Sequence, residues 1–379
     1  MVGQENIPTR LTRAAAKRCS AMEASNSQPQ PQSKKKRVAL SELPDLSNAV
    51  NFRTGAVQSK RRKTRSEKKE QDLGLEKSSC KEIKVSSITD SWIDGGEVQD
   101  PQMVAEYASD IYQYLRSMEV EPKRRPLSNY METVQVDLTA NMREVLIDWL
   151  VDVAEEYKLL SDTLYLTVSY IDRFLSYKAI SRKRLQLLGV SSMLIASKYE
   201  EITPCNVKDL CYITANTYDK QEVVSMEGDV LEFLKFEMGN PTVRTFLQRF
   251  IEAGQGDSKS PNSELAFLVH YLAELSLIDY GCIKFVPSVV AASAVYLARF
   301  TIDPKNHPWN EKLEKCTGYK VKELKECVHA LLELQLNKKC SSLVAVRDKY
   351  KEHKFKCVST LLPRPEIPSF FFDKLEEQT

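Results

Sequence analysis

Apolar residues recur every three to four positions through most of the chain beyond residue 100, which is the spacing of one face of an α-helix. A first stretch of this kind covers residues 103–118, and a second begins after Thr139, a residue type that caps helix N-termini. Further helical patterns lie at 162–176, 181–198, 206–213 and 219–236. Because the chain has only 12 glycines and no alternating strand pattern, we predict an all-α fold.

The helical pattern begins again after Asn240-Pro241. A shift of 101 residues places four helical stretches of the first copy on four of the second, with their apolar positions in register. The matched segments are 142–146 on 243–247, 164–170 on 265–271, 190–199 on 291–300 and 230–231 on 331–332. Agreement of four helices at a single offset indicates two tandem copies of one five-helix unit.

The third helix of each copy is apolar nearly all round and rich in small residues. A helix without a polar face must be enclosed, so we expect it to be ringed by the other four helices of its unit. The predicted organisation is a basic regulatory tail at 1–100, the first helix with the first unit at 101–240, the second unit at 241–362 and a C-terminal tail at 363–379. Prolines and then Phe370-Phe371-Phe372 predict that this last tail is extended and packed on the surface.

Charge is distributed unevenly along the chain. Residues 1–90 hold 19 Lys and Arg against 10 Asp and Glu, a net charge of +9, which leaves −7 for the rest of a chain whose total is +2. The same stretch contains Phe52 as its single aromatic residue, out of 32 in the chain. So few large apolar side chains cannot offset the entropy lost on ordering, and we predict that the tail is disordered.

Composition excludes several classes of protein. The longest charge-free apolar runs have about 13 or 14 residues, fewer than the 20 or so that span a bilayer, and no apolar stretch follows the N-terminus as in a secretory signal. Nine cysteines without framework spacing are typical of reduced thiols in an intracellular protein. The four histidines and the cysteines lack zinc-site spacing, so we predict no metal and no cofactor. The chain has neither a phosphate-binding glycine loop nor a plausible nucleophile–base pair, so we expect no enzyme activity.

Four sequence motifs then point to a family. Residues 142–153 read M-R-E-V-L-I-D-W-L-V-D-V and resemble the M-R-x-I-L-x-D-W-L-V-E-V of the cyclin box. The motifs YIDRFL, LQLLG and ASKYEE follow at the family's spacing, at 170–175, 185–189 and 196–201. Over about 100–360 the chain therefore resembles a cyclin, and Asp152 and Tyr170 are similar to those of A-type members, as in plants. Val145 and Asp152 replace the usual Ile and Glu, which shortens side chains in the family's substrate-docking groove.

The resemblance implies a cyclin-dependent kinase as partner. Charge pattern alone would describe Lys198 and its acidic neighbours as solvated charges at a helix end. However, the shift of 101 residues places Glu227 on Val328, so this acid is specific to the first copy. In the family, Lys198 and Glu227 pair and hydrogen-bond the kinase backbone beside apolar anchors. The kinase-binding residues implied are Ile111, Lys198, Tyr199, Glu200, Glu201, Glu227 and Phe236.

The resemblance also implies a docking groove for Arg-x-Leu segments of substrates or inhibitors. Its residues are Met142, Val145, Leu146, Trp149, Asp152, Leu185 and Gln186. Periodicity alone would assign this stripe to the core. In the family's groove a Leu fills the pocket, Gln186 bonds the peptide backbone and Asp152 attracts the Arg. Arg143 and Asp172 are implied as a structural ion pair within the box.

Basic clusters mark the N-terminal tail. Lys34, Lys35, Lys36 and Arg37, and then Lys60, Arg61, Arg62 and Lys63, are typical of nuclear-import sequences, with nucleic-acid contact or solubilising charge as alternatives. Arg37, Leu40 and Asp45 fit the destruction box R-x-x-L-x-x-x-x-N except that Asp45 replaces Asn. The basic clusters therefore predict a nuclear protein, with the cytoplasm as a further location, and the resemblance implies that the ubiquitin-ligase degradation machinery recognises it.

We therefore expect a regulatory subunit that binds and activates a cyclin-dependent protein kinase and recruits Arg-x-Leu substrates during cell-cycle progression. The alternative is a transcription factor of the same two-unit fold that binds nucleic acid. That class predicts a basic concave face and an N-terminal zinc ribbon. Because residues 91–379 are net −7 and C-x-x-C pairs are missing, we expect no direct nucleic-acid partner and no membrane partner.

Overall fold

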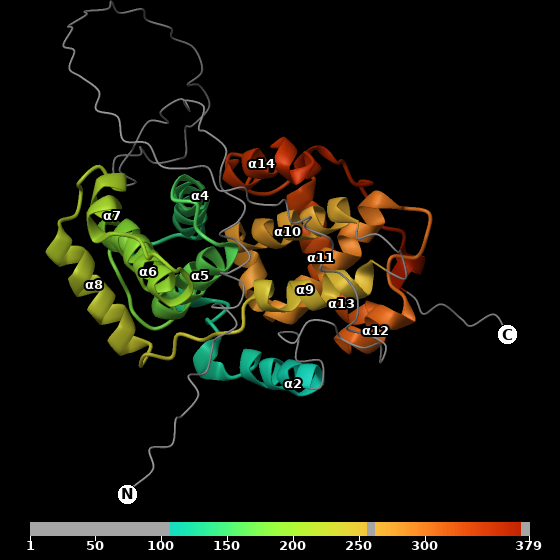
Figure 1. Cartoon of the computed structure of the whole chain (residues 1–379), viewed down its shortest axis with the longest axis horizontal. Coiled ribbons are helices and arrows are strands. Elements are labelled where there is room, and N and C mark those ends of the chain that lie inside the picture. Colours follow the sequence, from blue (N-terminus) through green and yellow to red (C-terminus); the bar gives the residue numbers. More distant parts are fainter. Residues whose placement is uncertain (1–106, 256–261, 373–379) are drawn as a thin grey trace, which may run out of the picture. The chain divides into compact units, whose positions relative to one another are not determined.

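The computed structural model describes residues 107–255 and 262–372, which form helices and connecting segments without a strand (Figure 1). The first repeat comprises α4 (Ala140–Glu156), α5 (Ser161–Leu175), α6 (Leu185–Glu200), α7 (Val207–Ile213) and α8 (Lys220–Phe233). The second comprises α9 (Val243–Gly254), α10 (Ser263–Ile278), α11 (Pro287–Ile302), α12 (Glu311–Thr317) and α13 (Val321–Gln335). The predicted all-α fold with two successive five-helix units is confirmed. The basic tail predicted at 1–100 lies outside the described residues.

The helices begin where the sequence supplies caps. The side chain of Thr139 accepts a hydrogen bond from the backbone N–H of Met142, as predicted for the start of α4. Asp219 and Glu222 form a reciprocal capping box at the start of α8. Pro287 occupies the first turn of α11, where its missing N–H leaves no intrahelical bond unmade.

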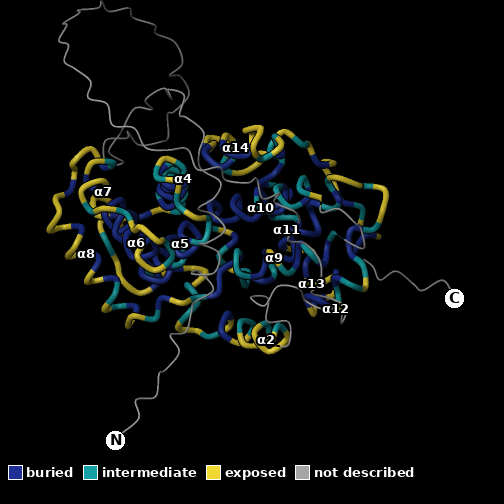
Figure 2. The backbone as a smooth tube through the Cα atoms, in the orientation of Figure 1, coloured by how far each residue is buried: buried dark blue, intermediate teal, exposed yellow. Residues whose placement is uncertain are grey.

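The third helix of each repeat forms its centre. Residues 185–197 of α6 are all buried, and α6 contacts α4, α5, α7 and α8, as expected for a helix enclosed by its unit (Figure 2). Gly189 allows α6 to approach α4 closely, because a Cβ there would lie 2.9 Å from Cδ1 of Leu146. In the second repeat α11 packs against α9, α10 and α13, whereas α12 packs mainly on α9.

The two repeats differ around the fourth helix. Helix α12 begins 104 residues after α7, whereas α13 begins 101 residues after α8. The connection before α12 is longer than its counterpart, and the connection after it is shorter. Gly318, with φ of 73°, makes the short connection possible, because this left-handed conformation is readily adopted only without a side chain.

Helix α2 (Ala108–Glu119) contacts the second repeat. The ring of Tyr112 packs edge-on against Phe246 and Phe250 of α9, and its hydroxyl donates to the carbonyl of Thr317 at 2.7 Å. At the other end of α2, the buried carboxylate of Glu119 accepts a hydrogen bond from the backbone N–H of Ser288. The predicted segment 101–240 grouped this helix with the first unit, but these side-chain contacts lie on the second.

The C-terminal segments lie against both repeats. Helix α14 (Ala345–Tyr350) contacts α4 and α10, and Lys349 forms a buried ion pair with Glu274 at 3.0 Å. The three phenylalanines of the tail belong to a 3-10 turn, Ser369–Phe372, rather than to an extended strand. Phe371 and Phe372 are buried, so the tail contributes to the core as well as lying on the surface. None of the described helices is long and apolar enough to span a bilayer.

Candidate functional site

The side chains of Lys198 and Glu227 form an ion pair between the end of α6 and the middle of α8, with 2.6 Å between Nζ and Oε1. Glu227 is buried, whereas about half of the Lys198 side chain is exposed. The last turn of a helix stabilises a cation, and this turn places Lys198 at the surface. An ammonium group has three N–H donors, so the Lys198 ammonium still has donors for a partner after bonding Glu227.

Aromatic side chains flank this pair. Tyr199 is 48% exposed and Phe236 is 71% exposed, although large aromatic rings are usually well buried. The Tyr199 hydroxyl lies over Gly239, where a Cβ would come within 2.9 Å of it. Ile111 is also exposed, and α2 carries it. The first repeat and α2 thus carry exposed apolar groups, and one of them, Tyr199, directly follows Lys198 of the charged pair, a combination found in protein interfaces.

The two acidic residues after Tyr199 occupy different settings. Glu200 is half-buried in the last turn of α6. The carboxylate of Glu201 accepts hydrogen bonds from the backbone N–H of Leu160 at 2.7 Å and from the hydroxyl of Thr163 at 2.6 Å. Helix α5 has no capping side chain at Leu160 itself, so Glu201 supplies the missing acceptor from another element. Glu201 thus joins the end of α6 to the N-terminus of α5, and its predicted contact with a kinase stays a prediction.

Arg143 and Asp172 form a bidentate ion pair in the interior. Nε of Arg143 lies 2.9 Å from Oδ1 of Asp172, and Nη2 lies 2.8 Å from Oδ2. Burial alone would lower the pKa of Arg143, but Asp172 and the hydroxyl of Tyr130 outweigh it and raise that pKa. The sequence did not indicate Tyr130, which donates to Asp172 at 2.8 Å.

The same guanidinium reaches the second repeat. Nη1 of Arg143 donates to the carbonyls of Leu277 and Ile278, each at 2.7 Å. These carbonyls end α10 and have no partner within their own helix. The sequence motif predicts a pair inside one box, whereas the structure also uses Arg143 to join the two repeats.

The predicted docking-groove residues divide into two groups. Met142, Val145, Trp149 and Asp152 are half-buried on α4, and Leu146, Leu185 and Gln186 are buried beneath or beside them. Leu146 packs where α4 meets α6 at Gly189, and the four half-buried residues of α4 are the more exposed part of this set. Sequence periodicity cannot make this division on α4, because the buried Leu146 and the half-buried Met142, Val145 and Trp149 fit a single helical stripe.

Several predicted sites lie outside the described residues. They are the import clusters at Lys34, Lys35, Lys36 and Arg37 and at Lys60, Arg61, Arg62 and Lys63, and the degradation motif at Arg37, Leu40 and Asp45.

The arrangement of two helical repeats with a charged and aromatic surface on the first defines a class of protein. The family model for the cyclin N-terminal domain matches residues 110–239, and the model for the cyclin C-terminal domain matches residues 241–364. The chain therefore belongs to the cyclin family. Members of this family are regulatory subunits rather than enzymes, and the chain is accordingly a cell-cycle regulatory protein.

Relatives narrow the class further. The chain is 57% identical to Cyclin-A3-1 of Oryza sativa subsp. japonica over 100% of both chains, and 50% identical to Cyclin-A3-2 of Arabidopsis thaliana over 98% of both. It is 54% identical to the G2/mitotic-specific cyclin C13-1 of Daucus carota, over 91% of this chain and 98% of that one. The predicted resemblance to A-type cyclins of plants is confirmed.

A solved structure shares the fold. A viral cyclin from herpesvirus saimiri matches with a TM-score of 0.52 at 23% identity, over 59% of this chain and 96% of that one.

Proposed function

We propose that this cyclin binds and activates a cyclin-dependent protein kinase of the cell cycle. The observation that carries the proposal is the partly exposed Lys198–Glu227 pair on the first repeat, which also exposes the rings of Tyr199 and Phe236. Exposed apolar anchors within a polar surround are the anatomy of a protein interface. The names of the A-type relatives, one of them mitotic-specific, support a role in the cell cycle.

The mechanism is activation by differential binding. Lys198 hydrogen-bonds the kinase backbone while Glu227 fixes its ammonium, and Tyr199, Phe236 and Ile111 fill apolar positions of the kinase. Contact with the kinase C-helix pushes that helix inward, which completes the kinase's own Lys–Glu pair and orders its activation loop. The cyclin supplies only the free energy by which it binds the active conformation better than the inactive one.

A histone-kinase assay with purified kinase tests the proposal. The double variant Lys198→Ala/Glu227→Ala loses the charged centre of the interface, and we expect the apparent affinity for the kinase to fall about 30-fold or more. The matched control is Lys315→Ala/Glu311→Ala, which removes an exposed ion pair of the same 2.6 Å length from α12. Full activation by the first variant at wild-type concentrations would exclude the pair from the mechanism.

We further propose that the α4 row of Met142, Val145 and Trp149 binds Arg-x-Leu segments, with Asp152 attracting the Arg. Support comes from the half-burial of these side chains and from the family motif. The variant Trp149→Ala should reduce phosphorylation of an Arg-x-Leu substrate about tenfold. Phosphorylation of a short peptide without the motif should stay unchanged, and an equal loss for both substrates would contradict a docking role.

The N-terminal tail is proposed to direct import and degradation. Lys34, Lys35, Lys36 and Arg37 with Lys60, Arg61, Arg62 and Lys63 would bring the protein to the nucleus, and Arg37, Leu40 and Asp45 would bind the ubiquitin-ligase machinery. Arg37→Ala/Leu40→Ala should lengthen the half-life of the protein in dividing cells. An unchanged half-life would exclude the motif.

A further inference from the structure

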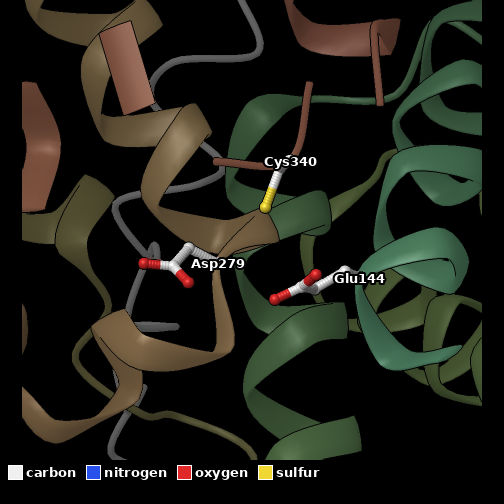
Figure 3. Close-up of side chains that lie close together, drawn as sticks. All are labelled: Glu144, Asp279 and Cys340. Carbon is white, nitrogen blue, oxygen red and sulfur yellow. The ribbon is translucent and has the colours of Figure 1, made fainter. Parts of the chain in front are cut away.

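Three potential metal ligands from separate segments meet at the boundary of the two repeats. Glu144 lies on α4, Asp279 follows α10, and Cys340 lies in the connection between α13 and α14. One ligand atom from each residue falls within 4.8 Å of the others (Figure 3). Figure 3 shows the three side chains close together, each from a different segment of the chain.

We propose that Glu144, Asp279 and Cys340 bind a divalent transition-metal ion of the zinc type. A thiolate with two carboxylates suits an ion that accepts both sulfur and oxygen, and it does not suit Ca²⁺ or Mg²⁺, which take oxygen ligands only. Zinc–oxygen bonds of about 2.0–2.2 Å and zinc–sulfur bonds of about 2.3 Å require ligand atoms 3 to 4 Å apart, so a small contraction of the cluster completes the site.

Burial of Asp279 gives independent support. This residue is only 7% exposed, and its carboxylate accepts hydrogen bonds from the backbone N–H of Gly281 at 3.1 Å and the thiol of Cys282 at 3.4 Å. Within the described residues, no Lys, Arg or His forms an ion pair with it. A buried carboxylate without a counterion is strongly destabilising, and a metal ion would supply that counterion.

The surrounding cations have other partners. The guanidinium of Arg143, next to Glu144 in the sequence, pairs with Asp172. Lys339, next to Cys340, forms its ion pair with Glu333 at 2.9 Å, and its charge also interacts with Asp279 at longer range. Neither neighbour forms an ion pair with a carboxylate of the cluster.

The side chains are also held in place before any ion binds. The backbone N–H of Tyr280 donates to the carboxylate of Glu144 at 3.3 Å, which ties α4 to the segment after α10. Cys282 donates to Asp279 and does not belong to the cluster, so Cys340 is its single thiol ligand. An ion held by these three side chains would fix α4 of the first repeat against the second repeat. The inference does not depend on kinase binding, because it rests on residues outside that surface.

Cobalt binding to the purified full-length protein tests the proposal. Co²⁺ substitutes for zinc and gives a thiolate-to-metal charge-transfer band only when a cysteine coordinates it. We expect one equivalent of Co²⁺ to bind with this band, Zn²⁺ to displace it, and Zn²⁺ to raise the melting temperature. Cys340→Ser should abolish the band, and Glu144→Gln should weaken Co²⁺ binding about 10- to 100-fold or more.

A matched control is Cys357→Ser, which removes a cysteine 3.6 Å from Nδ1 of His353 outside the cluster. This variant should bind Co²⁺ as the wild type does. Glu144→Gln changes a half-buried side chain and keeps the test open if Cys340→Ser does not fold. Absence of the band from the wild type, loss of the band in Cys357→Ser, or wild-type affinity in Glu144→Gln would each overturn the proposal.

Discussion

The two repeats share their helix order but differ in what covers them. In the first repeat Tyr199 is exposed at the end of α6, whereas its counterpart at the end of α11, Phe300, is fully buried. The ring of Phe371 from the C-terminal turn packs edge-on against Phe300, with 5.6 Å between centroids. In place of Glu227 the second repeat has the buried Val328. The surface that we propose for the kinase is thus covered in the second repeat by the chain itself.

The face of the first box helix shows the same contrast. Val145 and Trp149 are half-buried on α4, and their counterparts on α9 are Phe246 and Phe250, which are buried. The ring of Tyr112 from α2 covers both phenylalanines. Segments from both ends of the described chain therefore bury, on the second repeat, the faces that correspond to the surfaces we propose for partners on the first.

The largest expected difference between the repeats is in the stability contributed by an arginine that both have at the same position, Arg143 in the first and Arg244 in the second. Arg143 is buried against Asp172. The second repeat has Ala273 in place of Asp172, and Nε of its arginine, Arg244, lies 3.6 Å from Oδ2 of Asp162 of the first repeat at a partly exposed site. Arg143→Ala leaves a buried carboxylate unpaired and should lower the free energy of unfolding by about 3–5 kcal/mol. Arg244→Ala should lower it by about 1 kcal/mol or less. Urea denaturation of the two variants measures both effects.

Double substitution sharpens this test. Arg143→Met/Asp172→Leu removes both charges, so no carboxylate is left unpaired, and it should be less destabilising than Arg143→Ala alone. Equal losses of unfolding free energy for Arg143→Ala and Arg244→Ala would contradict a distinct role for the buried Arg143–Asp172 ion pair.

Much of this fold could be predicted from the sequence, but less could be predicted of the surfaces proposed to bind partners. The predicted helix at 206–213 agrees with α7 within about a residue. Helix limits can be predicted in this way because they depend on the local spacing of apolar residues and on capping residues such as Thr139 at the start of α4. The docking of α2 on the second repeat could not be predicted, since the amphipathic pattern shows that a face is covered but not by which element. Likewise the sequence could not predict that the carboxylate of Glu201 caps α5, because the two elements meet only in the folded chain.

The next contrast separates binding from stability. Tyr199→Ala should weaken kinase binding by about 2 kcal/mol, as loss of an aromatic anchor does, and should leave the free energy of unfolding nearly unchanged. Phe300→Ala removes a buried ring and should lower the free energy of unfolding by about 3–5 kcal/mol. Its affinity for the kinase, corrected for the folded fraction, should stay at the wild-type value. Calorimetric titration with kinase and urea denaturation measure the two quantities, and a stability loss as large for Tyr199→Ala would contradict the comparison.

The smallest expected effect tests how α2 covers the second repeat. Tyr112→Phe keeps the ring against Phe246 and Phe250 but removes the hydrogen bond to Thr317, so we expect a loss of about 1 kcal/mol near neutral pH. Burial raises the pKa of Tyr112 from 10.0 to about 12, so the folded state favours the neutral phenol. Below pH 10 the wild type therefore keeps the stability that the Tyr112 hydroxyl contributes, and it loses this stability as the pH rises toward 12. The difference in free energy of unfolding between the wild type and Tyr112→Phe narrows over the same interval. The urea midpoints of both proteins, measured across this pH interval, give that difference. The control is Tyr114→Phe, which changes an exposed tyrosine on the same helix. A difference that stays constant would mean that the Tyr112 hydroxyl is not held in the interface between α2 and the second repeat.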